Sequence, residues 1–229
     1  MKKWGLPQEW LKLIACVTML IDHVGAALLP QYIILRVIGR IAFPIYCFLL
    51  AEGVAYTKNP RRYGLRLGIG AVLSEIPFDL ALFGAMTLRY QSVMITLLLG
   101  FVMAECMKRV KKEYCKILLT IPFAVAAEWL CTDYGAWGVG LIAMFVLTRN
   151  APHKLVAQTV GMAAICCLMD SYVMTIWGLR VPIEMFALAS MVLIALYSGQ
   201  KLSRSRTLQW GFYLFYPVHL TVLWILCSL

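Results

Sequence analysis

The sequence is poor in charge and contains no long polar segment. Only 14% of its 229 residues are charged, whereas 62% are hydrophobic, and the mean hydropathy is +0.80. Hydrophobic stretches recur from residue 11 to residue 229 and are separated by short polar breaks. These proportions exclude a water-soluble globular domain and are typical of a polytopic helical membrane protein.

Signatures of several other classes are also missing. The eight cysteines form no C-x-x-C pair and have no zinc-ligand spacing, so we expect no metal site. No small-residue cleavage site follows the first hydrophobic segment, and we expect that segment to be retained as a span. No internal repeat with broken helices in matching positions is recognisable, which argues against the repeat-built transporters.

The positive charges alternate along the chain. The net charge is +10, and most of the 21 Lys and Arg residues lie in every second polar break, beginning with Lys2 and Lys3. A nucleic-acid surface would not alternate in this way, whereas the positive-inside rule requires it. We therefore expect no nucleic-acid partner. We expect instead a cytoplasmic N-terminus in a multi-pass protein of the cytoplasmic (inner) membrane, with the lipid bilayer around it.

The predicted fold is an all-α, polytopic membrane helix bundle that forms a single domain over residues 1–229. Hydrophobic segments of helical length predict about nine spans, at residues 11–29, 32–56, 63–84, 92–110, 115–131, 135–149, 154–174, 181–198 and 208–227. The sequence Asp133-Tyr134-Gly135 predicts a tight turn before the sixth segment. That segment is short, and it is either a full span or a re-entrant piece shielded by protein.

Ionisable residues inside these segments are candidates for function, because each costs roughly 3 kcal/mol or more in a bilayer. Lys12 and His23 in the first span are eleven residues apart. They project from one helix face, with about 16 Å between them along the axis, which is about half the thickness of the hydrocarbon core. Asp22 points about 100° away from His23, and we expect it to pair with Arg36 or Arg40.

The second and third spans carry further charges. Arg36 and Arg40 lie one turn apart, ahead of Pro44, where we expect the helix to kink. Glu75 and Asp79 flank a proline in the third span. Unpaired carboxylates would be very costly there, so we expect them to pair with Arg36 or Arg40 or to line a wet cavity.

Two residues near the end of the chain complete the polar pattern. His219 lies beside Pro217 in the last span and is either a hydrogen-bonded packing residue or a participant in chemistry. Glu184 flanks an outer loop, and we assign it to the membrane interface without a role in a site. The hypothesis that follows is one cavity in the outer half of the membrane, formed by Asp22, His23, Arg40, Glu75, Asp79 and His219.

A compact cationic cluster follows the second span. It consists of Lys58, Arg61 and Arg62 in the loop, with Arg66 just inside the third span. One interpretation is a topology signal of the positive-inside type. The other is a phosphate-binding rim, because arginine forks match phosphate geometry.

Motifs from the first span to the last carry a family resemblance: Leu11-Lys12-x-Ile14-Ala15, Met19-x-Ile21-Asp22-His23-x-Gly25, Leu35-Arg36-x-Ile38-Gly39-Arg40-Ile41-Ala42-Phe43-Pro44, Glu52-Gly53, Arg62-Tyr63-x-x-Arg66-Leu67, Ser74-Glu75-Ile76-Pro77-Phe78 and Tyr213-x-x-Tyr216-Pro217-x-His219-Leu220. On these residues the chain resembles the TraX family of membrane proteins, named for the pilin acetylase of conjugative plasmids. That family is in turn similar to the broader transmembrane acyltransferases, including the acyltransferase-3 enzymes and the lysosomal heparan acetyltransferase.

The resemblance implies an acyl-CoA-dependent transmembrane acetyltransferase. Acyltransferase-3 enzymes typically have a basic residue, ten others and then a histidine in the first span, and Lys12 and His23 have this spacing, with Lys in place of the usual Arg. The donor substrate would be cytoplasmic acetyl-CoA or another acyl-CoA. The acceptor would be an amine or hydroxyl on the outer side, with a pilin N-terminus, a cell-wall sugar and a polysaccharide all left open.

The same resemblance suggests a role for each candidate residue. His23 would be the general base, Arg40 or a helix N-terminus would stabilise the oxyanion, and Glu75 would be the first candidate for the carboxylate partner of His23. The full candidate catalytic set is His23, Asp22, Arg40, Glu75 and His219. The donor phosphates would lie among Lys12, Lys58, Arg61, Arg62 and Arg66.

Two other functions account for the same sequence pattern. A transporter would use the buried charges as a proton or anion relay. A non-catalytic membrane assembly partner would use small-residue faces, such as Gly64-x-x-x-Gly68, to bind other spans. The sequence also leaves open a homo-oligomer and, if transfer occurs, an acyl-imidazole intermediate on His23.

Overall fold

The computed structural model describes residues 5–87, 89–169, 173–176, 179–203 and 205–229. Lys2 and Lys3, with which the predicted charge pattern begins, lie outside these residues. The regular secondary structure of the described residues is helical, apart from one two-stranded antiparallel hairpin. The chain divides into two compact units, Met1–Tyr46 with Leu155–Phe212 and Cys47–Lys154 with Tyr213–Leu229. The single domain over residues 1–229 stays a prediction.

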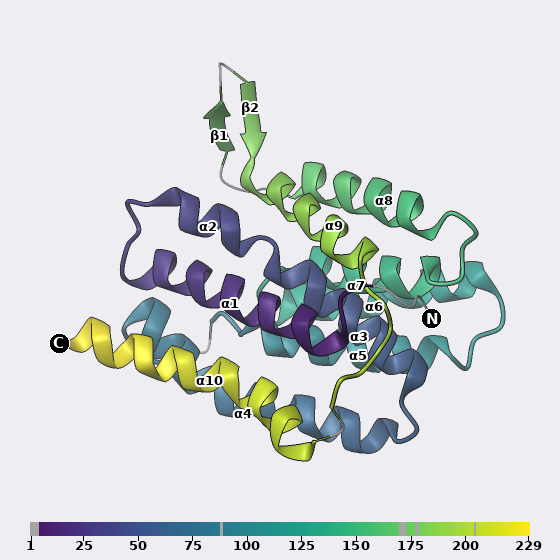
Figure 1. Cartoon of the computed structure of the whole chain (residues 1–229), viewed down its shortest axis with the longest axis horizontal. Helices are drawn as coiled ribbons and strands as arrows, with labels where there is room; N and C mark the ends of the chain where they lie inside the picture. Colours follow the sequence, from purple (N-terminus) through teal and green to yellow (C-terminus); the bar gives the residue numbers. More distant parts are fainter. Residues whose placement is uncertain (1–4, 88, 170–172, 177–178, 204) are drawn as a thin grey trace. The chain divides into compact units, whose positions relative to one another are not determined.

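The first unit contains elements from both ends of the sequence. They are α1 (Gln8–Ala27), α2 (Ile33–Gly39), the start of α3 (Ala42–Tyr56), α8 (Lys154–Leu168), β1 (Val173–Ile176), β2 (Leu179–Pro182), the 3-10 helix η1 (Ile183–Ala189), α9 (Ser190–Ala195) and the start of α10 (Arg206–Ser228). The two strands pair with Met174 opposite Val181. Figure 1 shows this hairpin projecting from the helices, and β2 leads directly into the first residue of η1.

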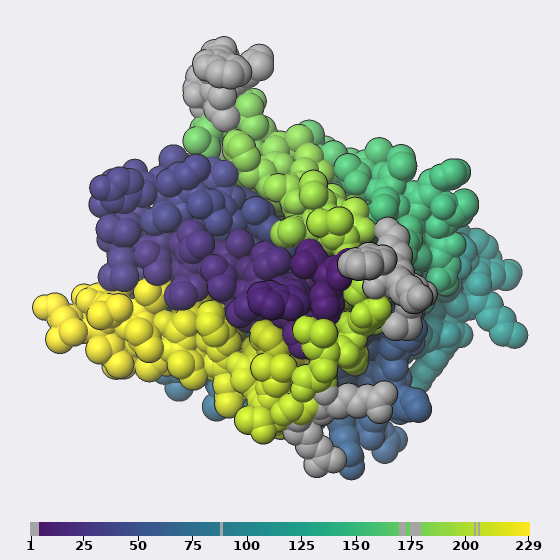
Figure 2. Space-filling model, viewed as in Figure 1, coloured from purple at the N-terminus to yellow at the C-terminus, as the bar shows by residue number. Residues whose placement is uncertain are grey.

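Helices α1 and α2 pack against each other in the first unit. Leu11, Ala15 and Met19 recur at four-residue intervals on α1 and are buried, which gives the helix one apolar face. The chain turns after Ala27, and α2 then runs beside α1 (Figure 1), with the two in contact on the face that Figure 2 presents. A Cβ added at Gly25 would lie 2.7 Å from the Cβ of Leu35, so glycine permits this close approach.

The break between α2 and α3 falls at Arg40–Ile41, one turn before Pro44. Proline has no N–H to donate to the carbonyl four residues earlier, which in this helix is that of Arg40. Pro44 is instead accommodated in the first turn of α3. The helix therefore breaks at Arg40–Ile41, one turn before the position at which a kink was predicted.

The second unit contains the rest of α3 and α10 together with α4 (Pro60–Phe83), α5 (Val93–Met107), α6 (Glu113–Trp129) and α7 (Gly135–Thr148). Helix α5 contacts α4, α6 and α7, and its residues Thr96, Met103 and Ala104 have no exposed surface. Tyr134 and Gly135 have φ values of 62° and 44°. They form the tight turn predicted before the sixth segment.

The number of membrane spans differs from the prediction. Among the described residues, three helices are long and apolar enough to cross a membrane, namely Gln8–Ala27, Ile33–Tyr56 and Thr207–Ser228. Helices α5, α7 and α8 are apolar but have only 14 or 15 residues, which is about 22 Å at ~1.5 Å per residue against a hydrocarbon core of about 30 Å. The nine-span topology is not confirmed, although every predicted span contains helical residues.

Two predicted spans have the wrong boundaries. The segment 154–174 is helical only to Leu168 among its described residues, and Val173 and Met174 belong to β1. The segment 181–198 begins in β2 and becomes helical at Ile183. The hairpin strands are rich in β-branched residues, which favour extended backbone, and Pro182 ends the second strand.

We expect Gly100→Ala to destabilise the protein by about 1–3 kcal/mol, because a buried side chain occupies the space. A Cβ at Gly100 of α5 would overlap the side chain of Ile142 on α7, whereas a Cβ at Gly140, also on α7, would meet nothing within 4 Å. Gly140→Ala should therefore stabilise by up to about 1 kcal/mol through helix propensity. Thermal unfolding in detergent measures both effects.

The variant Gly100→Ala with Ile142→Val supplies the control, because valine lacks the Cδ1 atom that the new methyl would overlap. This double variant should recover most of the lost stability. Equal shifts for Gly100→Ala and Gly140→Ala would contradict the close packing of α5 on α7.

Candidate functional site

The first unit contains a buried network of two arginines and two carboxylates. Arg40 donates from Nη2 to Asp22 at 2.7 Å and from Nη1 to Glu184 at 2.9 Å. Arg36 pairs with the other oxygen of Asp22. Asp22, Arg40 and Glu184 are each at most 8% exposed. The formal charges of the four side chains cancel, which is the condition for keeping such groups away from water.

The residues of this network come from three helices that lie close together. Helix α1 supplies Asp22, α2 and its end supply Arg36 and Arg40, and η1 supplies Glu184. Arg40 also donates from Nε to the carbonyl of Arg36 at 3.3 Å. Gly39 lies so close to Asp22 that a Cβ there would overlap its carboxylate. The network therefore ties α1, α2 and η1 together.

The structure confirms one sequence prediction here and corrects another. Asp22 was expected to pair with Arg36 or Arg40, and it pairs with both. Glu184 was assigned to the membrane interface without a role in a site, and the second part is wrong, because Glu184 is buried and bound to Arg40. It lies 144 residues from Arg40 in the sequence. The sequence offered one signal for this pairing, because Glu184 is the single acidic residue in an otherwise apolar stretch after Pro182.

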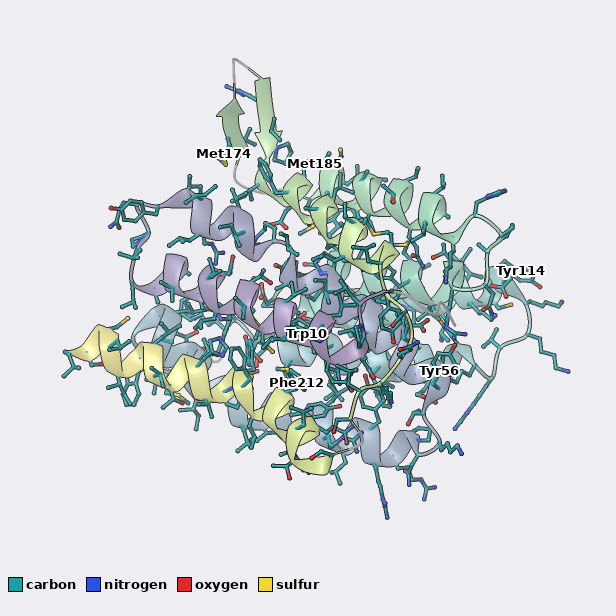
Figure 3. The ribbon with its side chains drawn as sticks, viewed as in Figure 1. Trp10, Tyr56, Tyr114, Met174, Met185 and Phe212 are labelled. Atoms are coloured by element: carbon teal, nitrogen blue, oxygen red, sulfur yellow. The ribbon has the colours of Figure 1, made fainter. Side chains whose placement is uncertain are left out.

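His23 and Lys12 lie on one uninterrupted helix, α1. His23 follows Asp22 directly and is 8% exposed, so the ion network holds the backbone beside it. Lys12 is partly buried, and its ammonium lies 5.3 Å from the centre of the Phe212 ring, labelled in Figure 3. Such a cation–π contact stabilises a partly desolvated ammonium.

The cationic cluster at the start of α4 belongs to the second unit. Asn59 caps the helix by accepting from the Arg62 N–H at 3.0 Å, and Pro60 occupies the first turn. Lys58, Arg61 and Arg62 are exposed at this end. Positive side chains beside the positive end of a helix dipole repel each other, and an anion bound there would relieve that repulsion.

Arg66 lies one turn further along α4 and is less exposed than Arg61 and Arg62. Its guanidinium carbon is 5.7 Å from the ring centre of Tyr63 and 5.6 Å from that of Tyr213. The two aromatic faces hold the guanidinium in place.

Glu75 and Asp79 have partners within the second unit. Glu75 accepts from the Ser92 hydroxyl at 2.5 Å and from the Ser92 N–H at 3.2 Å. Asp79 accepts from the Thr87 N–H at 2.8 Å. Because Ser92 is the first residue before α5, Glu75 links α4 to the start of α5. The pairing of these carboxylates with Arg36 or Arg40 stays a prediction, as does the role of Glu75 beside His23.

His219 is buried in α10, and its Nδ1 lies 2.7 Å from the carbonyl oxygen of Phe215. A carbonyl can only accept, so Nδ1 carries the proton and Nε2 is the basic nitrogen. The Phe215 ring stacks on the imidazole at 4.9 Å, and the Tyr216 ring meets it edge-on at 5.5 Å. Pro217 lies in the same turn. This environment fixes the tautomer and the ring plane.

The candidate residues thus fall into two sets. Lys12, Asp22, His23 and Arg40 belong to the first unit. The second unit holds the other six: Lys58, Arg61, Arg62, Arg66, Glu75 and His219. Within the described residues, no group of three or more His, Cys, Asp and Glu side chains is arranged to hold a metal ion.

Helices that are long and apolar enough to cross a membrane, with the buried charges among them paired, are the features of a helical membrane protein. The family model for the TraX protein matches residues 7–227, and the chain belongs to the TraX family.

Two relatives extend this comparison. The chain is 28% identical over 235 residues to the probable fimbrial assembly protein FimC, serogroup H1, of Dichelobacter nodosus, which covers 95% of this chain and 93% of the relative. It is also 28% identical over 152 residues to an uncharacterized protein of Rickettsia prowazekii (strain Madrid E), covering 64% of this chain and 56% of that protein. No solved structure matches.

We expect Asp22→Asn to destabilise the first unit more than Glu184→Gln does. Asp22 neutralises two arginines and Glu184 one, and breaking a buried pair costs about 3–5 kcal/mol. Thermal unfolding of the purified protein gives the order. Glu113→Gln, which removes an exposed pair with Lys116 (Glu113 side chain 68% exposed), should change stability by less than about 1 kcal/mol. Equal effects of all three changes would contradict the buried network.

Proposed function

We propose that this protein is a membrane-embedded acyltransferase, which moves an acetyl or other acyl group from cytoplasmic acyl-CoA to an amine or hydroxyl on the outer side. The observation that supports this most directly is the geometry of α1. One unbroken helix carries a partly buried cation and, about 16 Å further along its axis, a buried histidine. A pantetheine arm is of about the same length as this separation.

The chemistry requires one proton acceptor near the thioester. The acceptor nitrogen or oxygen attacks the thioester carbon while His23 takes its proton, and a tetrahedral oxyanion forms. Collapse of this intermediate breaks the C–S bond, and the CoA thiolate leaves and takes up the proton from His23. The products are the acylated acceptor and free CoA. A histidine has a suitable pKa for both steps near neutral pH.

The ion network suggests a role for Arg40 that differs from the expectation for the oxyanion. Its guanidinium donates to Asp22, to Glu184 and to a backbone carbonyl. We therefore assign Arg40 and Asp22 as positioning residues, which hold α1 and the backbone of His23 in place. A cation already shared by two carboxylates has little net field to offer a transient oxyanion.

The acyl donor would carry its phosphates at the cationic positions. Lys58, Arg61 and Arg62 are exposed at the start of α4, where the helix dipole also favours anions. The similarity to acyltransferase-3 enzymes belongs to this proposal, as does the location in the inner membrane.

The name of the Dichelobacter nodosus relative, a probable fimbrial assembly protein, narrows the choice of acceptor. Among a pilin N-terminus, a cell-wall sugar and a polysaccharide, it favours a pilus or fimbrial subunit. The same name favours the second candidate, a non-catalytic assembly partner. Of the predicted Gly64-x-x-x-Gly68 face, Gly64 is already packed, because an added Cβ would lie 2.7 Å from the Phe101 ring. An added Cβ at Gly68 would meet nothing within 4 Å, so Gly68 is the part of the face that is open to another helix.

We expect His23→Ala to lower the rate of acyl transfer by at least about 100-fold, the usual contribution of a general base, with acetyl-CoA binding unchanged. The assay is transfer of radiolabelled acetyl groups from acetyl-CoA to co-reconstituted pilin in proteoliposomes. His153→Ala, an exposed histidine in the α7–α8 connection, is the matched control and should retain full activity. Wild-type turnover in His23→Ala would contradict the assignment of His23 as the general base. Absence of transfer by the wild-type protein, together with normal pilus assembly in His23→Ala, would replace the enzyme by the assembly partner.

We expect Arg61→Ala with Arg62→Ala to weaken acetyl-CoA binding about tenfold and to make the remaining affinity less sensitive to salt, because fewer phosphate contacts are screened. Calorimetry on purified protein at two salt concentrations measures both quantities. Arg109→Ala with Lys111→Ala removes the same charge from a different exposed loop and should leave binding unchanged. If the Arg61 and Arg62 variant bound acetyl-CoA with wild-type affinity, the cluster would act only as a topology signal and not as a phosphate site.

A further inference from the structure

The second unit has a cavity of about 220 Å³ where several of its helices end. Helix α3 ends at Tyr56, α5 at Met107 and α7 at Thr148, and α6 begins at Glu113 beside them. Figure 3 labels Tyr56 and Tyr114 at these ends of α3 and α6. None of the residues assigned to acyl transfer lines this cavity.

The inner wall of the cavity is apolar. Ala51 and Val54 of α3, Met107 of α5 and Val146 of α7 line it. Three of them, Ala51, Val54 and Met107, are almost completely buried in the protein. Such a wall accommodates methylene groups and offers nothing to a free inorganic ion.

Three cations surround the apolar wall. They are Lys108, Lys116 and Arg149, and the side chains of Lys116 and Arg149 are 23% and 26% exposed. One carboxylate, Glu113, also lines the cavity, so the net charge of the lining is positive. Arg149 donates from Nε to Glu52 at 2.8 Å, and its guanidinium lies 4.7 Å from the ring centre of Tyr56. These two contacts fix its position.

The two lysines have weaker partners. Lys108 pairs with Glu105 and Lys116 with Glu113, each three residues away on the same helix. Pairs of this kind contribute little to stability near the protein surface. Each ammonium has three donors, so both lysines have donors to offer to an additional anion.

We propose that this cavity binds the headgroup of an anionic phospholipid, with the phosphate between Lys108, Lys116 and Arg149 and the first methylenes of the glycerol and acyl chain against the apolar wall. The alternating charges predict that this end of the unit faces the cytoplasm, where the leaflet is rich in anionic lipid. Basic pockets between membrane helices on that side are suited to such headgroups.

The size of the cavity favours a lipid headgroup over the nucleotide of acyl-CoA. Pockets that enclose a drug-sized ligand measure roughly 300–1,000 Å³, so a cavity of about 220 Å³ encloses a phosphate group but not a whole nucleotide. A headgroup needs only its phosphate enclosed, because its acyl chains stay in the bilayer.

The test compares two double variants with the same change in charge. Lys108→Gln with Lys116→Gln removes cations that line the cavity, whereas Arg109→Gln with Lys111→Gln removes two exposed cations of the same loop that do not. The full chain is purified in non-ionic detergent and titrated with phosphatidylglycerol or phosphatidylcholine of the same acyl chains. Native mass spectrometry counts the bound lipid, and thermal unfolding records the stabilisation that binding confers.

We expect phosphatidylglycerol to bind in preference to phosphatidylcholine and to raise the unfolding temperature. Its affinity should fall roughly 25-fold in the Lys108 and Lys116 variant, since each of the two cations near an anionic headgroup contributes roughly fivefold. It should change by less than about twofold in the control variant. Ala55 lies at an exposed position that lines the cavity. The change Ala55→Phe fills the opening of the cavity without altering charge and should abolish lipid binding.

Four results would overturn the proposal. Equal binding of the two lipids would remove the headgroup preference, and equal losses in the two double variants would reduce the effect to the general field of the loop. Undiminished binding in Ala55→Phe would place the lipid elsewhere. Displacement of bound phosphatidylglycerol by acetyl-CoA would make the cavity a nucleotide-phosphate site. Each result is independent of whether acyl transfer occurs.

Discussion

The constraint on which the first unit depends is the neutralisation of Arg40 inside an apolar protein. An isolated guanidinium in such surroundings is costly, and a single carboxylate would leave most of its donors unsatisfied. Asp22 and Glu184 together with the Arg36 carbonyl satisfy three of them. Since these partners come from α1, η1 and α2, the electrostatic requirement sets which elements meet. The glycine at position 39 and the burial of Glu184 accord with this requirement.

Ion pairs between residues of adjacent segments could be predicted from the sequence, whereas a pair between residues far apart in the sequence could not. Asp22 and the two arginines lie in adjacent apolar segments, so their pairing follows from the cost of leaving any of them unpaired. Glu184 lies 144 residues from Arg40, and its position near the outer end of the predicted span 181–198 is that of an ordinary interfacial residue. Helical segments were recognisable from hydrophobic length, whereas the hairpin at Val173–Pro182 was hidden because short apolar strands and helices have the same composition.

The distribution of the candidate residues gives each unit a different share of the proposed chemistry. The first unit has the histidine whose backbone is held by the ion network, together with Lys12 on the same helix. The second has the exposed cations at the start of α4 and a histidine whose tautomer is fixed by a backbone carbonyl. Two carboxylates already neutralise Arg40, which leaves it little net field for an oxyanion. A sequence cannot reveal this, since the partners of a buried side chain are set by the folded structure.

The shortness of the apolar helices has a consequence for the surrounding lipid. A bilayer that meets an apolar helix of 14 or 15 residues faces a hydrophobic mismatch of about 8 Å, and it adapts by local thinning unless neighbouring protein covers the ends. Thinning brings the two aqueous phases closer together beside the protein. Sensitivity of the protein's stability to bilayer thickness would then follow from the length of these helices.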